Sequence, residues 1–132
     1  MLFTFTVTSK VREEYINIDA LVEEALEKSG VEAGIMTIFT PHTTAGITIN
    51  ENADPDVTRD LVYGMNMTFD NKKEYRHAEG NSDSHMKSSL TGASETLIID
   101  GGEVIYGTWQ STYFAEFDGP RDRKVHIKVI EG

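Results

Sequence analysis

Cysteine is absent from this chain of 132 residues, and no apolar run approaches the roughly 20 residues that a membrane-spanning helix needs. Without cysteine the protein has no disulfide framework and no thiol chemistry. The N-terminal stretch "MLFTFTVTSKVREEY" also lacks the basic region and continuous apolar segment of a secretory signal. We therefore expect a cytoplasmic protein with no membrane partner.

Basic residues are scarce as well: 12 Lys and Arg stand against 22 Asp and Glu, which gives a formal net charge of −10. Proteins that bind nucleic acid cluster Lys and Arg to neutralise phosphates, and this sequence contains no such cluster. We therefore expect no nucleic-acid partner. A small anionic ligand remains compatible with the composition, because local geometry can outweigh net charge.

What is present is typical of one globular domain. Hydrophobic residues make up 39% of the chain and charged residues 26%, and the length suits a single hydrophobic core. The sequence shows no internal repeat, linker or low-complexity segment. We predict a single domain that spans residues 1–132.

The apolar periodicity predicts seven strands and two helices, in the order ββαββαβββ. In "LFTFTVT" apolar residues alternate with threonine, as in a half-buried strand. Asp19 precedes a helix that Gly30 ends, and Asp54 with Pro55 begins a second helix. The other strands are expected in these segments: "REEYINI", "GIMTIFT", "AGITINE", two around Asp-Gly in "ETLIIDGGEVIYGTWQSTYFAEF", and "RKVHIKVI". The pattern favours an α+β fold with a mainly antiparallel sheet system.

The single tryptophan lies inside the second strand of that long segment, in "GTWQST". We expect Trp109 to pack in the core, with a bulge at Gly107. Near the C-terminus, "EFDGPRDR" combines acids and arginines at a turn, which predicts solvated charges or ion pairs within the turn. His126 alternates with aliphatic residues and is expected on the surface.

The polar stretch "RHAEGNSDSH" holds two of the four histidines. His77 and His85 flank Glu79, Asn81 and Asp83, and imidazole and carboxylate are the usual ligands of divalent metals. The spacing matches no recognised metal motif, so a solvated loop explains the stretch equally well. The segment that follows contains "KSS", with Lys87 at its start; it can hold an anion or begin a short helix.

A second candidate lies in "TPHTTAG", between two predicted strands. His42 is accompanied there by the hydroxyls of Thr43 and Thr44, and Pro41 removes one backbone donor. Connecting loops often carry function. The same residues also suit a plain turn in which the hydroxyls satisfy backbone groups.

Three segments, "PHTTAGITINE", "HAEGNSDSHMKSSLTG" and "SETLIIDGGEVIYGTWQ", occur in this order and resemble the motifs of the YjbQ-like family of small bacterial and archaeal proteins. The resemblance runs from the first strand to the last. It implies an α+β fold of about seven strands in two sheets, a β-sandwich with two helices. It also implies a homotrimer with a histidine-rich cleft near the subunit boundary.

The resemblance further implies which residues line the cleft. Carried over by motif, they are His42, His77, Glu79, Asn81 and His85. The three histidines are the expected ligands of a divalent metal ion, Zn or Mg. From the chemistry of phosphate binding we add Thr43, Thr44 and Lys87 as expected substrate-binding residues.

Some relatives in the family are described as having thiamine-phosphate synthase activity. By resemblance, the chain is expected to be an enzyme that acts on a small phosphorylated metabolite. In that reaction hydroxymethylpyrimidine diphosphate is coupled with thiazole phosphate, and diphosphate is released. Two alternatives stay open: a metal-dependent hydrolase with Glu79 as general base, and a non-enzymatic trimeric module that binds a metal or metabolite.

Overall fold

The computed structural model describes all 132 residues and contains eight strands and three helices. The strands are β1 (Leu2–Thr8), β2 (Glu14–Asn17), β3 (Gly34–Phe39), β4 (Ala45–Glu51), β5 (Ser94–Asp100), β6 (Glu103–Val104), β7 (Gln110–Glu116) and β8 (Asp122–Glu131). The helices are α1 (Asp19–Ser29), α2 (Pro55–Thr68) and α3 (Ser82–Thr91). This mixed α+β architecture confirms the predicted fold class.

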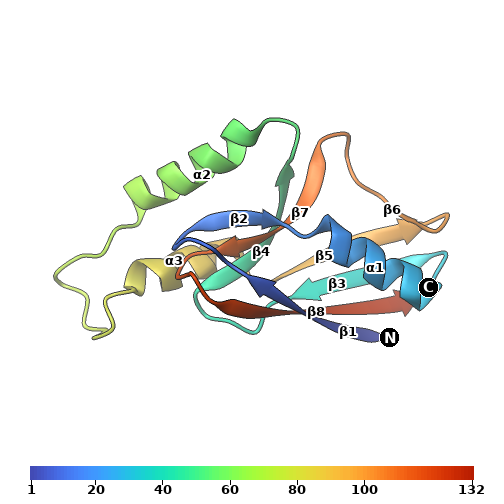
Figure 1. Cartoon of the computed structure of the whole chain (residues 1–132), viewed down its shortest axis with the longest axis horizontal. Helices are drawn as coiled ribbons and strands as arrows, with labels where there is room; N and C mark the ends of the chain where they lie inside the picture. Colours follow the sequence, from blue (N-terminus) through green and yellow to red (C-terminus); the bar gives the residue numbers. More distant parts are fainter.

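The strands form two antiparallel sheets, one of five strands in the order β1-β8-β3-β5-β6 and one of three in the order β2-β7-β4. Helix α1 lies against β7 and β8, whereas α2 lies beside β2, at the edge of the three-stranded sheet (Figure 1). One apolar core joins the two sheets and α1. Its buried members are Val7, Ile18, Val22, Ala25, Met36, Ile38, Ala45, Ile47, Leu97, Ile99, Phe114, Val125, Ile127 and Val129.

Several local predictions are confirmed. Along β1 the odd-numbered residues point inward, as the alternation predicts. Gly30 ends α1 with a left-handed φ of 66°, a conformation that glycine adopts without steric cost. The side chain of Asp54 accepts a hydrogen bond from the backbone N–H of Asp56 and so caps α2. Gly101 and Gly102, both at positive φ, form the β5–β6 hairpin turn.

The third helix is absent from the predicted order of elements, in which a short helix from Lys87 was only one of two alternatives. Residues 82–91 form α3. The side chains that this helix buries are all polar: Asp83, Ser84, Lys87 and Ser88. A helix with a polar buried face has no apolar stripe, so the periodicity that reveals most helices is missing. The eighth strand, β6, has only two residues, which is too short for an alternating pattern to show.

The predicted burial of Trp109 is wrong. Its side chain is 62% exposed, in the turn between β6 and β7. The chain leaves the five-stranded sheet after Val104 and crosses to the three-stranded sheet at Gln110. A hydrogen bond of 3.1 Å from the backbone N–H of Gln110 to the carbonyl of Gly107 closes this turn. Trp109 therefore lies at a crossover and not inside a continuous strand.

Helix α2 contributes little to the core. None of its residues is buried, and Val57, Leu61 and Met65, which recur every four residues, are only half-buried. No helix combines the length and the apolar character that a membrane crossing requires.

Candidate functional site

Three segments that are distant in sequence enclose a polar pocket of about 350 Å³. The β3–β4 loop supplies one wall, the segment that leads into α3 supplies the second, and the β7–β8 turn together with the start of β8 supplies the third. The lining residues are Pro41, His42, Thr43, Thr44, His77, Glu79, Asn81, His85, Asp118, Arg121 and Arg123. All five residues expected to line the cleft, and both threonines, are therefore brought together.

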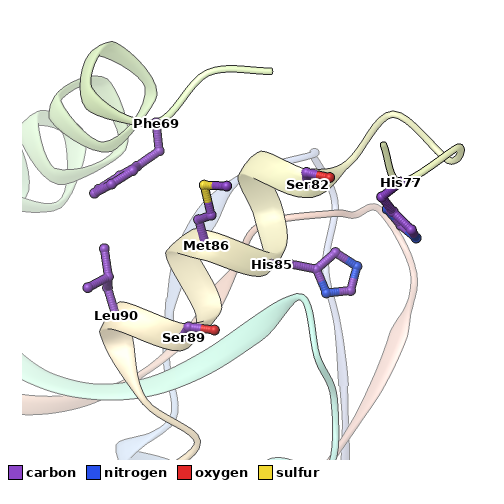
Figure 2. Close-up of a pocket in the computed structure, with 7 residues that line it drawn as sticks. All are labelled: Phe69, His77, Ser82, His85, Met86, Ser89 and Leu90. Atoms are coloured by element: carbon purple, nitrogen blue, oxygen red, sulfur yellow. The ribbon is translucent and has the colours of Figure 1, made fainter. Parts of the chain in front are cut away.

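His77 and His85 form a pair at one side of the pocket. Their ring centroids lie 5.2 Å apart and the rings are nearly perpendicular, at 88°. Figure 2 shows His85 projecting from α3 toward His77, which lies on the preceding loop. The ring hydrogen bonds among the histidines are those of His42 and His126. The ring nitrogens of His77 and His85 are therefore free to meet a ligand.

His42 is held in a different state. Its Nε2 accepts a hydrogen bond of 2.9 Å from the backbone N–H of Lys124. A backbone N–H can only donate, so Nε2 presents its lone pair and the neutral ring carries its proton on Nδ1. Burial, followed by the nearby positive charge of Arg123, lowers the pKa of His42 and favours this neutral form.

This hydrogen bond argues against a metal-binding role for His42. With the Nε2 lone pair engaged by Lys124 and a proton on Nδ1, the imidazole has no free nitrogen lone pair for a cation. It offers one N–H donor instead. His42 is thus suited to an anionic or carbonyl group of a ligand.

Arg123 and Glu116 form a buried ion pair beneath the pocket. Arg123 Nε donates to both carboxylate oxygens of Glu116, at 2.9 and 3.1 Å, and Nη2 donates to Thr44 Oγ1 at 2.8 Å. Burial raises the pKa of Glu116, but the hydrogen bonds from Arg123 and Ser9 lower it by more than that. The pKa of Glu116 is therefore below its ordinary value. None of these contacts uses Nη1 of Arg123, which remains available to an anion in the pocket.

The three residues expected to bind phosphate, Thr43, Thr44 and Lys87, have different surroundings in the structure. Thr43 is exposed in the pocket wall, whereas Thr44 is buried and its hydroxyl holds Arg123. Lys87 does not line the pocket. Its fully buried Nζ donates to Glu13, to Asn66 at 2.6 Å and to Asp83 at 3.2 Å. An ammonium group has three hydrogens to donate, so these contacts leave Lys87 none for a phosphate.

Asn81 has an unsatisfied atom. Its Nδ2 donates to Asp118 Oδ2 at 2.8 Å, while its Oδ1 is buried without a hydrogen-bond partner. A buried acceptor left without a partner is costly, and native proteins keep few of them. Because Asn81 lines the pocket, this oxygen is suited to a ligand donor or a cation.

Asp118, Arg121 and Arg123 were expected only as turn charges, yet all three line the pocket. The periodicity of β8 contains a signal for one of them. Arg123 falls in step with Val125, Ile127 and Val129, which are all buried, so the alternation places its side chain on the inward face. A charge on an inward face is buried at a cost and indicates a specific partner.

The fit of a metal ion is partial. No three His, Asp or Glu side chains are grouped so that they could hold a metal ion. The donors that do fit a cation are the imidazoles of His77 and His85 and the unpartnered oxygen of Asn81.

Comparison with known proteins places the sequence in one family. The family described as "UPF0047 protein YjbQ-like" matches residues 3–132. A UPF0047 protein of Methanocaldococcus jannaschii is 48% identical over 130 residues, which cover 98% of this chain and 94% of that protein. The UPF0047 protein YugU of Bacillus subtilis is 48% identical over 131 residues, covering 98% and 99%.

Solved structures show the same architecture. An uncharacterized conserved protein of the YjbQ/UPF0047 family from Clostridium acetobutylicum is 50% identical, with a TM-score of 0.95 and coverage of 97% of this chain and 99% of that one. A hypothetical protein from Aeropyrum pernix is 30% identical, with a TM-score of 0.94 and coverage of 100% and 99%. The chain therefore belongs to the YjbQ-like UPF0047 family.

Proposed function

We propose that this protein is an enzyme that acts on a small phosphorylated or diphosphorylated metabolite bound in the polar pocket. The observation that carries the proposal is the pocket itself, whose lining combines Arg121, Arg123 and His42 with the free imidazoles of His77 and His85. Donors of this kind complement phosphate oxygens, and they do so inside a strongly acidic chain.

The specific reaction proposed is the formation of thiamine phosphate. The thiazole nitrogen attacks the methylene carbon of hydroxymethylpyrimidine diphosphate with its lone pair. The carbon–oxygen bond to diphosphate breaks, and its electron pair leaves with the diphosphate. Negative charge grows on the leaving group, so fixed donors placed around it lower the barrier. His42, Arg121 and Nη1 of Arg123 are assigned this role.

A divalent cation is proposed at His77 and His85, with Asn81 Oδ1 and Glu79 as neighbouring oxygen donors. Imidazole ligands favour Zn over Mg, which prefers oxygen. When bound, the cation would supply positive charge next to the phosphates. His42 is left out of this ligand set because its Nε2 lone pair is engaged. Metal content of purified protein, compared between wild type, His77→Ala and His85→Ala, tests the assignment.

The homotrimer is also retained as a proposal. Ile35 lies opposite both Ile98 and Ile130 across neighbouring strands, so three isoleucines that are 42–60% exposed form one apolar stripe on the five-stranded sheet. Covering such a stripe with another copy of the chain removes apolar surface from water. Light scattering should report three times the mass of one chain. A monomer at all working concentrations would contradict the assembly.

A hydrolase is the second candidate, because Glu79 lines the pocket beside the two free imidazoles and can act as a general base. The deciding experiment supplies both phosphorylated precursors and a divalent ion, and detects the products directly. Thiamine phosphate formed by wild type, and lost in His85→Ala, supports the coupling reaction. Release of phosphate from one precursor alone supports the hydrolase. Binding without turnover identifies a metabolite-binding module.

A further inference from the structure

The side-chain amide of Asn81 has only one orientation that its neighbours allow. Its Nδ2 donates to Asp118 Oδ2 at 2.8 Å, and Asp118 also forms an ion pair with Arg121. A carboxylate accepts hydrogen bonds and an amide oxygen cannot donate one. If the amide were turned over, two oxygens without a proton would face each other. Asp118 therefore fixes Nδ2 toward itself and leaves Oδ1 on the opposite side of the amide.

The oxygen of this amide has no donor within the protein. Oδ1 is buried, and no protein group donates a hydrogen bond to it. Asn81 stands at the N-cap of α3, where a side-chain oxygen ordinarily accepts from the first turn of the helix, yet it makes no such bond. Native proteins leave few buried acceptors without a partner. Because Asn81 lines the polar pocket, the missing donor has to come from an occupant of that pocket.

The unpartnered oxygen lies close to the groups assigned to the phosphate. Arg121 Nη2 and Asn81 Nδ2 contact the same atom, Asp118 Oδ2, at 3.2 and 2.8 Å, so the two side chains lie side by side. Both line one pocket of about 350 Å³, a volume that suits a small ligand. A ligand group that reaches Asn81 is therefore only a few bonds from a phosphate that Arg121 binds.

We propose that Asn81 Oδ1 accepts a hydrogen bond from a hydroxyl or amino group that the ligand carries a few bonds from its phosphate. This inference rests on the proposed anion site and adds a specificity-determining residue to it. An alkyl group at the same place would leave the buried oxygen without a partner, so the site should discriminate against ligands that lack the donor. A carbonyl oxygen has two lone pairs, so a cation at His77 and His85 is compatible with this contact.

The test compares 2-hydroxyethyl phosphate with propyl phosphate by isothermal titration calorimetry, in EDTA and again with one equivalent of Zn²⁺. The two probes have the same charge and nearly the same size, and differ in a terminal hydroxyl against a methyl group. Wild type should bind the hydroxyl probe about tenfold more tightly in both conditions, the scale expected when one buried acceptor gains a donor. Asn81→Leu keeps the size of the side chain without its oxygen and should reduce this ratio to about one.

A second variant tests the fixed orientation of the amide. In Asp118→Asn the new side chain can donate as well as accept, so the amide of Asn81 is free to turn over, and the ratio should fall although Asn81 is retained. A merely structural role of Asp118 would weaken both probes equally and leave the ratio unchanged. Asn52→Ala is the matched control, because Asn52 lies outside the pocket and its Oδ1 accepts from Tyr113 Oη at 3.1 Å. It should keep the full ratio.

The outcomes separate this inference from the proposed function. If neither probe binds to wild type in either condition, the anion site fails and the role of Asn81 fails with it. If both probes bind equally tightly, the anion site stands, a water molecule is the partner of Oδ1, and the inference is overturned. A preference that disappears when Zn²⁺ is added means that the cation occupies Oδ1, and a preference that persists in Asn81→Leu means that another residue recognises the hydroxyl. Either result overturns the inference as well.

Discussion

Helices α1 and α3 are of similar length but are held to the fold by opposite means. Helix α1 buries Val22 and Ala25 in the apolar core. Helix α3 is anchored by polar contacts: Ser84 Oγ donates to the carbonyl of Phe117, Ser88 Oγ donates to the carbonyl of Ala45, both at 2.6 Å, and Lys87 lies in a buried ion-pair cluster. Apolar burial is non-directional, whereas hydrogen bonds are directional.

The difference suits what each helix carries. Helix α1 supplies apolar bulk, and its core contacts impose no hydrogen-bond geometry. Helix α3 carries Asn81 at its start and His85 on its exposed face, and both must point into the pocket. Directional contacts on the buried face fix the rotation of the helix about its axis. The polar burial that makes α3 hard to predict is thus what orients the site.

The largest expected effect comes from the buried cluster of α3. Lys87→Ala removes the buried ammonium group that Asp83 and Glu13 share and leaves them only Arg12, and breaking a buried ion pair costs about 3–5 kcal/mol. Val22→Ala on α1 removes only apolar groups and should cost about 2 kcal/mol. Urea unfolding of both variants measures the difference. The comparison fails if Lys87→Ala is the milder substitution.

The next effect concerns activity. His42→Ala removes the Nδ1–H donor and should reduce kcat/KM by about 10²-fold, the scale found when one donor to a developing charge is lost. The unfolding free energy should change little, because the loop is half-exposed. His126→Ala is the control, since His126 lies outside the pocket, stacked on Phe39. Val22→Ala should show the reverse behaviour: lower stability with unchanged kcat/KM per folded molecule. Equal loss of activity in both histidine variants would remove His42 from the site.

The dependence of unfolding free energy on acidic pH should also differ between substitutions in α3 and in α1. Burial raises the pKa of Asp83, but hydrogen bonds from Arg12 and Lys87 lower it more, so the folded protein holds this proton more weakly than the unfolded chain. The stabilisation is therefore complete above the ordinary pKa of Asp, about 3.9, and is lost as the pH falls below it. Asp83→Asn should flatten the acid limb of a stability–pH curve, whereas Val22→Ala should lower the whole curve and keep its slope. An unchanged slope in Asp83→Asn would contradict the assignment.

The smallest effect is expected at the crossover between the sheets. Trp109→Ala should change the unfolding free energy by less than about 0.5 kcal/mol, as is usual for an exposed side chain. Phe114→Ala in β7 should cost about 3–5 kcal/mol, because Phe114 is fully buried. Thermal denaturation of both variants and wild type measures the two changes in stability. A large loss in Trp109→Ala would mean that another chain covers this side chain.

Much of the fold was predictable because its signals are local. The alternation in β1, the Asp54 cap of α2 and the paired glycines of the β5–β6 turn each depend on neighbours in sequence. Helix α3 was missed because its buried face satisfies polar groups through partners elsewhere in the chain. The spacing of apolar residues along the sequence cannot reveal such partners.

The histidine motifs of the candidate site were predictable, but its arginines and the roles of its residues were not. The residues of the two histidine motifs do meet in one pocket. Whether His42 is a ligand or a donor depends on one hydrogen bond from the backbone of Lys124, which is 82 residues away in sequence. Arg123 depends likewise on Glu116 across the β7–β8 turn. Such roles follow from tertiary contacts that no local pattern encodes.

Strand β8 contributes residues to both the pocket and the apolar core. Arg123 and the backbone N–H of Lys124 serve the pocket, while Val125, Ile127 and Val129 lie in the core between the sheets. A slip of one residue in strand pairing would turn Arg123 and all three apolar side chains outward together. A chain that misfolds in this way would lose the pocket contacts of Arg123 and expose its apolar core together. Under the proposed function, the phosphate-binding capacity of a protein preparation would measure the fraction of molecules in which β8 is in native register.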